Sequence, residues 1–142
     1  MKRVACLSVL LFCVCGCTTK RVPRSFSQVL APGWATIEIR DGVDYDRAWR
    51  TTLGILIREF DVEFISKDDG YVRTAWTYTW SGVYQQNYRV RVTAKFSDDR
   101  KSVDIKSEAQ ALRGSDWLTG VDARQLATLK TDMMGTIGRT TR

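Results

Sequence analysis

Few side chains in this 142-residue chain are equipped for catalysis. Histidine is absent, which removes the commonest acid–base catalyst and metal ligand. The acid pairs Asp68–Asp69 and Asp98–Asp99 have the chemistry of a catalytic dyad, but both stand where turns are expected, and Asp is favoured in turns for backbone reasons. Gly-rich phosphate loops and metal-ligand spacings are also missing from the sequence. We therefore expect no enzymatic activity, no cofactor and no metal.

The N-terminal residues have the three parts of an export signal. Lys2 and Arg3 form a basic head, residues 4–16 form a compact and mostly apolar run, and a small residue precedes Cys17. The run is too short for a membrane-spanning helix, which needs about 20 apolar residues. We expect residues 1–16 to be a cleaved signal peptide.

The break itself, Val14-Cys15-Gly16-Cys17, resembles a bacterial lipobox. That resemblance implies cleavage before Cys17 and acylation of this residue, and two or more acyl chains anchor a protein stably to a membrane. Two alternatives stay open: an ordinary cleaved signal peptide, and a metal or redox site in the C-x-C-x-C run of Cys13, Cys15 and Cys17. The metal or redox site would lose Cys13 and Cys15 when the signal peptide is cleaved. All four cysteines of the chain lie at or before position 17, so the mature domain has no disulfide.

Length and charge fit one exported domain. Removing residues 1–16 from the 142 leaves 126, enough for a single core but not for two. Without Lys2 and Arg3, the 22 basic residues become 20 against 16 acidic ones, a net charge of +4. This mild excess does not indicate nucleic acid, and it favours an anionic lipid or polysaccharide surface.

Hydrophobic periodicity predicts one α+β domain over residues 34–142, joined to the lipidated Cys17 by a flexible tether over residues 17–33. Alternating residues predict strands at 34–40, 61–66, 72–80, 88–96 and 103–109, and helical spacing predicts helices at 45–60 and 123–137. Residues 112–121 are expected to form a loop. The order β-α-β-β-β-β-α indicates an antiparallel sheet with both helices on its apolar face.

One hairpin can be registered from the sequence alone. A two-residue loop at Asp99–Arg100 sets apolar residues against apolar ones and charges against opposite charges, and a one-residue slip would ruin both matches. The expected pairs are Phe96–Val103, Ala94–Ile105, Val90–Ala109, Lys95–Asp104 and Arg91–Glu108.

Aromatic side chains are the first candidates for binding. Trp76 and Tyr78 are expected to pack under the helices, where large aromatics supply much of the buried area. Trp80 and Tyr84, near a hairpin tip, and Trp117, in the glycine-flanked loop, are the expected partner contacts.

Basic side chains are the second candidates. Arg73, Arg89, Arg91 and Lys95 form a row on one sheet face, and this row could engage an acidic partner. The alternative is a solvated sheet face in which this row pairs across strands with acids such as Glu108.

Residues 44–80 resemble the repeated unit of BamC-type (NlpB-type) outer-membrane lipoproteins. Three stretches carry the likeness: DYDRAW from Asp44, DVEFI from Asp61 and DGYVRTAW from Asp69. The resemblance implies a helix-grip fold on an acylated tether and a non-enzymatic accessory role in inserting β-barrels into the outer membrane. This chain departs from the family in having one domain where the family has two, and a shorter tether. Thr18 is not the Asp that retains lipoproteins at the inner membrane in enteric bacteria, which favours the outer membrane.

Two functions follow from these patterns. The first is a lipid-anchored periplasmic scaffold or accessory subunit of an envelope complex, with an envelope protein as partner. The alternative is a small-ligand or lipid-binding module with a pocket between sheet and helices, lined by Trp76, Tyr78, Trp80 and the final helix. A filled core favours the scaffold, and an apolar cavity of several hundred Å³ would favour the binder.

Overall fold

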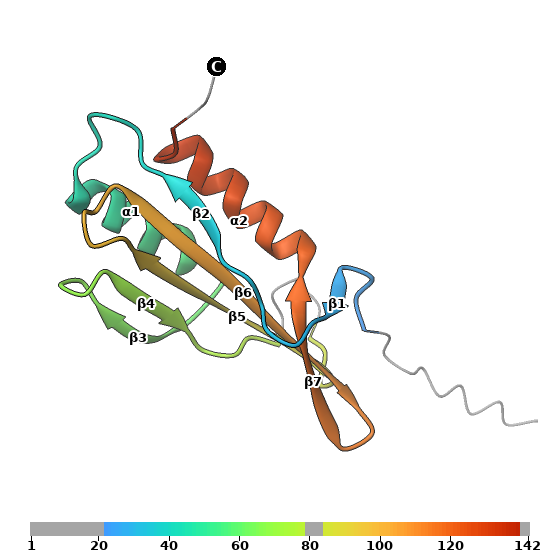
Figure 1. The fold of residues 1–142 in the computed structure, drawn as a ribbon. Coiled ribbons are helices and arrows are strands. Elements are labelled where there is room, and N and C mark those ends of the chain that lie inside the picture. Colours follow the sequence, from blue (N-terminus) through green and yellow to red (C-terminus); the bar gives the residue numbers. More distant parts are fainter. Residues whose placement is uncertain (1–21, 79–83, 140–142) are drawn as a thin grey trace, which may run out of the picture.

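The computed structural model describes residues 22–78 and 84–139, and it confirms the α+β fold. Seven antiparallel strands form one sheet, and two helices pack against one of its faces (Figure 1). In chain order the elements are β1 (Phe26–Gln28), β2 (Ala35–Glu38), α1 (Tyr45–Leu56), β3 (Val62–Ser66), β4 (Tyr71–Thr74), β5 (Tyr88–Phe96), β6 (Ser102–Arg113), β7 (Asp116–Asp122) and α2 (Ala123–Thr136).

The long strand β6 organises the sheet. The strand order is β1-β7-β6-β5-β4-β3, and β2 pairs with β6 as well. Along one edge of β6, β2 takes residues 102–105 and β7 takes residues 109–113. The other edge of β6 pairs through residues 103–111 with the whole of β5, in the register expected from the sequence: Phe96 lies opposite Val103, and Arg91 opposite Glu108. The remaining expected pairs, Ala94–Ile105, Val90–Ala109 and Lys95–Asp104, are confirmed too.

The core lies between the sheet and the helices. Every second residue of β5 and β6 faces the helices and is buried, while the residues between them face away. From α1, the indole of Trp49 packs against Phe96 with ring centroids 5.8 Å apart. From α2, Leu129 and Met133 complete the core. Asp44 caps α1, because its carboxylate accepts a hydrogen bond from the Arg47 amide at 2.7 Å.

Two expectations from the sequence are wrong: that residues 112–121 form a loop, and that the whole of residues 17–33 is a flexible tether. Residues 112–121 are not a loop: β6 continues to Arg113, the chain turns at Gly114 with φ of +64°, and β7 follows. Residues 26–28 are not part of the tether, because β1 pairs with β7. The close approach of β1 explains Gly120, since a Cβ there would meet the Phe26 ring at 2.4 Å. The folded domain therefore begins before residue 34.

The strand expected at residues 72–80 is also interrupted. The β4 ladder stops at Thr74, and pairing resumes only as a single bridge between Thr77 and Val90. The irregular stretch at Ala75 and Trp76 shifts the alternation of side chains. Trp76 therefore points to the face turned away from the helices, although simple alternation from Val72 places it in the core.

The buried carboxylate of Asp122 accepts hydrogen bonds that link the end of β7 to the start of α2 and to the residue before β1. Its side chain is fully buried and caps α2 by accepting a hydrogen bond from the Gln125 amide at 3.0 Å. It also accepts hydrogen bonds from the hydroxyls of Ser25, at 2.9 Å, and Tyr88. The Gln125 side chain does not return to this cap, as a capping box would require, but accepts a hydrogen bond from Ser107 on β6.

Candidate functional site

The sheet face turned away from the helices carries a cluster in which arginines lie against aromatic rings. We define the aromatic–arginine cluster as Trp76, Tyr78, Arg89, Arg91 and Trp117. The guanidinium carbon of Arg89 lies 4.8 Å from the ring centroid of Trp76 and 4.2 Å from that of Trp117. The guanidinium carbon of Arg91 lies 4.5 Å from the Trp76 centroid. Such cation–π contacts contribute about 0.5–2 kcal/mol each, more as water is excluded.

Hydrogen bonds hold both guanidinium groups in place. Arg89 donates from Nε to Gln110 at 2.8 Å and from Nη1 to the Tyr78 hydroxyl at 3.3 Å. Arg91 makes a two-pronged contact with Glu108, at 3.0 and 3.3 Å. A planar guanidinium fixed in this way keeps little rotational freedom. The cluster is therefore a preorganised surface, which loses less entropy when a partner binds.

The fold brings the cluster together from three segments. Trp76 and Tyr78 come from the irregular stretch after β4, Arg89 and Arg91 from β5, and Trp117 from β7. Trp117 stands opposite Leu112, near the hairpin turn between β6 and β7. Its ring also meets that of Tyr78 edge-on, with centroids 6.5 Å apart.

The structure gathers three of the residues that the sequence proposed as partner contacts and separates another. Arg89, Arg91 and Trp117 belong to the cluster, and Tyr84 borders it, half exposed, with its ring 6.0 Å from that of Tyr78. Arg73 lies elsewhere on the same face, paired with Glu63 on β3 at 3.0 Å. The sixth proposed contact, Trp80, falls outside the described residues.

Two cluster members were missed by sequence reasoning. Trp76 and Tyr78 were expected beneath the helices, but both are only partly buried and contact Arg89 on the opposite face. The predicted pocket between sheet and helices, lined by these two rings, is therefore wrong. The core side chains fill that space, including Val90, Val92 and Ile105, each with no exposed surface.

The ion pair between Arg91 and Glu108 gives a direct test of how the cluster is held. Each charge reversal, Arg91→Glu or Glu108→Arg, should lower the free energy of unfolding by about 1 kcal/mol, because the pair is only partly screened by water. The double reversal should recover part of that loss in urea unfolding. The cross-strand neighbours Lys95 and Asp104 are the control, since no ion pair of 4.0 Å or less joins them, and their reversals should be additive. Additivity at Arg91 and Glu108 as well would contradict the proposed coupling.

One carboxylate of each acid pair at the turns has a structural partner. Asp99 accepts hydrogen bonds from the Ser97 hydroxyl at 2.7 Å and from the Lys101 amide at 3.1 Å. These bonds lower the pKa of the Asp99 carboxyl, the hydroxyl of Ser97 being the main cause. Asp69 likewise accepts a hydrogen bond from the hydroxyl of Ser66. A carboxylate engaged in this way stabilises its own turn, as the sequence predicted.

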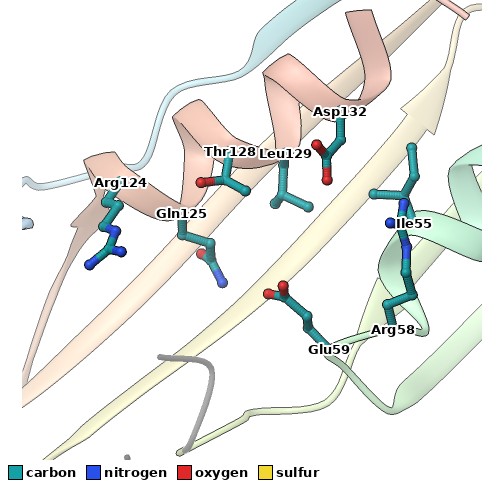
Figure 2. A pocket seen from close by; sticks show the side chains of 8 residues that line it. All are labelled: Ile55, Arg58, Glu59, Arg124, Gln125, Thr128, Leu129 and Asp132. Carbon is teal, nitrogen blue, oxygen red and sulfur yellow. The ribbon is translucent and has the colours of Figure 1, made fainter. Parts of the chain in front are cut away.

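A cleft of a different kind lies between the two helices. It is lined by residues 55–59, at and just after the end of α1, and by residues 124–132 of α2, and its volume is about 260 Å³ (Figure 2). The final helix thus does line a cleft, but the partner element is α1 and the walls carry charged and polar side chains.

Comparisons with known proteins do not assign this chain to a family. The chain matches no protein-family model, and no curated protein sequence matches it significantly. Within residues 22–78 and 84–139, none of the helices is long and apolar enough to cross a membrane. The same residues contain no group of three or more acidic, Cys or His side chains placed to hold a metal ion.

Proposed function

We propose that this chain is a lipid-anchored envelope protein that acts, without catalysis, as an accessory subunit, and that the aromatic–arginine cluster is its docking surface. The observation that carries the proposal is the set of stacked Trp and Arg side chains on the sheet face that no helix covers. Trp, Tyr and Arg are the residue types that dominate binding energy at protein interfaces. A domain does not need stacked Trp and Arg side chains on an outer sheet face to be stable, which favours a binding role for them.

The charge of this face indicates the chemistry of the partner. The basic members are Arg73, Arg89, Arg91, Lys95 and Lys106, and the acidic ones are Glu38, Glu63, Asp104 and Glu108. Basic groups exceed acidic ones by one over the whole face, and within the cluster Arg91 pairs with Glu108 whereas Arg89 takes part in no ion pair among the described residues. A partner surface with an acidic side chain beside an apolar centre would therefore be complementary to the cluster. The partner we propose is a protein subunit of the envelope.

The anchor is the second half of the proposal. The lipobox-like stretch before Cys17 supports acylation there, and Thr18 supports the outer membrane as the destination. The resemblance of residues 44–80 to BamC-type lipoproteins supports a role beside outer-membrane protein assembly. In this proposal the lipid supplies membrane attachment and the cluster supplies specificity.

Replacement of Cys17 tests the anchor. Cys17→Ser should yield a protein that incorporates no labelled palmitate and leaves the membrane fraction, because no acyl acceptor remains. The measurement is metabolic labelling followed by fractionation of the envelope. A Cys17→Ser protein that stays with the membrane through its own N-terminus would contradict the proposed anchor.

Site-specific crosslinking in intact envelopes tests the docking surface. A photoreactive residue in place of Tyr84, half exposed beside the cluster, should give a discrete adduct with one envelope protein. The matched control is the same residue at Lys130, which is exposed on α2 and faces away from the sheet's open side. The adduct at position 84 should disappear when Trp117 is replaced by Ala. Equal crosslinking from both positions, or an adduct that survives Trp117→Ala, would contradict the proposal.

A further inference from the structure

The cleft between the helices has a buried floor and a charged rim. Ile55 of α1 and Leu129 of α2, each 5 % exposed, are the apolar part of the floor. At about 260 Å³ the cleft lies just below the usual range for ligand pockets, roughly 300–1,000 Å³. It therefore suits one small group of a ligand, with the rest of the molecule lying at the rim.

Gln125, the third buried residue of the floor, carries an unsatisfied hydrogen-bond donor. The side chain is 2 % exposed, and its Oε1 accepts a hydrogen bond from the Ser107 hydroxyl. Its Nε2 has no hydrogen-bond partner among the described residues. Figure 2 shows this side chain directed into the cleft. Because a buried donor without an acceptor is unfavourable, the floor favours a ligand that brings an acceptor oxygen beside an apolar group.

The rim of the cleft carries both signs of charge at each of its ends. Figure 2 shows Arg124 beside Gln125, with the Glu59 carboxylate directed toward the same end. Arg58 and Asp132 lie toward the other end, so the lining has no net charge. Among the described residues, none of these four charged side chains takes part in an ion pair of 4.0 Å or less. A charged ligand group would meet a like charge at either end, and the rim therefore favours a neutral ligand whose groups both donate and accept hydrogen bonds.

We propose that this cleft binds the acetamido group of an N-acetylated amino sugar. The acetyl methyl group packs on Ile55 and Leu129, and the carbonyl oxygen gives Gln125 Nε2 the acceptor that it lacks. The amide N–H of the ligand donates to the carboxylate of Glu59, which lies toward the same end of the cleft. The sugar ring stays at the rim, where its hydroxyl groups meet carboxylates that accept hydrogen bonds and guanidinium groups that donate them.

The acetamido site is separate from the proposed docking surface. The cleft lies between the helices, and the aromatic–arginine cluster lies on the sheet face turned away from them, so both can be occupied at once. A peptide also carries secondary amides, but its backbone brings no hydroxyl groups for the four charged side chains of the rim. The rim therefore favours a sugar over a peptide.

Titration with N-acetylglucosamine, followed by ¹H–¹⁵N NMR, tests this site. The side-chain amide resonance of Gln125 should shift saturably, because the ligand gives Nε2 its first acceptor. Glucose, which has a hydroxyl in place of the acetamido group, and glucosamine, which has an ammonium group there, should each bind at least tenfold more weakly. N-acetyl-alanine methylamide keeps the acetyl group but has no hydroxyl groups for the rim, and it should bind about fivefold more weakly.

Two variants and a control separate the site from general effects, with binding followed by the backbone amide of Leu129. Gln125→Glu keeps an acceptor for Ser107 but removes the donor, and Glu59→Ala removes the acceptor for the ligand N–H. Each should weaken N-acetylglucosamine binding about tenfold, and Glu59 is exposed, so its replacement leaves the core intact. Lys130→Ala changes an exposed cation of α2 outside the cleft, and it should bind like the unaltered protein. A Gln125 resonance that does not move, equal binding of glucose or of the peptide, or unchanged binding in Glu59→Ala would each overturn the proposal.

Discussion

Alanine in place of Asp122 should lower the free energy of unfolding by about 3 kcal/mol. The substitution removes the cap of α2, which alone stabilises by about 1 kcal/mol. It also leaves the buried hydroxyl of Tyr88 and the hydroxyl of Ser25 without their acceptor, and hydrogen bonds to a charged group contribute about 1.5–3 kcal/mol each. The relief of an unfavourable buried charge offsets part of this sum. Chemical denaturation monitored by tryptophan fluorescence measures the change.

Asp44 is the matched control, because it caps α1 with the same side chain but is exposed. Asp44→Ala should cost only about 1 kcal/mol, since water takes over the freed groups. Tyr88→Phe should fall between the two, because it removes one bond from the buried carboxylate. Equal losses for Asp44→Ala and Asp122→Ala would show that Asp122 acts as a cap and nothing more. Hydrogen exchange should also increase in β1, which Asp122 ties to β7 through Ser25.

Alanine in place of Trp117 should reduce partner capture at least tenfold while the domain stays folded. Trp117 covers the guanidinium group of Arg89 and is only partly buried, so its removal costs about 1 kcal/mol of stability through the lost stacking. In the interface that we propose, the same ring is a central anchor, and such residues contribute about 2 kcal/mol or more to binding. Crosslinking yield from position 84 and the thermal midpoint, measured on the same preparation, give both quantities.

Trp34 and Trp49 provide the two controls for that experiment. Trp34 is 48 % exposed and lies over Lys106 outside the cluster, so Trp34→Ala should leave capture unchanged. Trp49 is 4 % exposed in the core, and Trp49→Ala should destabilise the domain by about 3–5 kcal/mol. Loss of folding in Trp117→Ala, with capture intact in the remaining folded protein, would make Trp117 a structural residue and remove it from the docking surface.

The parts of the fold that were predictable are those with an unbroken local pattern. β5 and β6 alternate without interruption, and their opposite charges coincide in one register only, so the pairing could be predicted residue by residue. The helices were predictable for the same reason, since apolar spacing and an N-cap Asp mark each start.

The parts that failed depend on contacts between distant segments. β7 alternates poorly in hydrophobicity, because Gly120 is small to admit the ring of Phe26 from β1, and neither strand has a strong pattern of its own. The break after Thr74 moves Trp76 to the other face, and only the bridge between Thr77 and Val90 reveals the shift. One residue in the sequence did point to the cleft between the helices. Ser107 is a polar residue in the middle of an apolar strand face, and its hydroxyl donates a hydrogen bond to the Gln125 side chain.

The docking of β1 on β7 also sets how far the domain can travel. If Cys17 is acylated as proposed, four residues separate it from Val22, which packs against the core, and a fully extended chain over that interval reaches about 17 Å. A tether running to residue 33 would reach about 55 Å. The shorter tether would keep the domain close to the bilayer, and this raises its effective concentration toward a membrane-embedded partner.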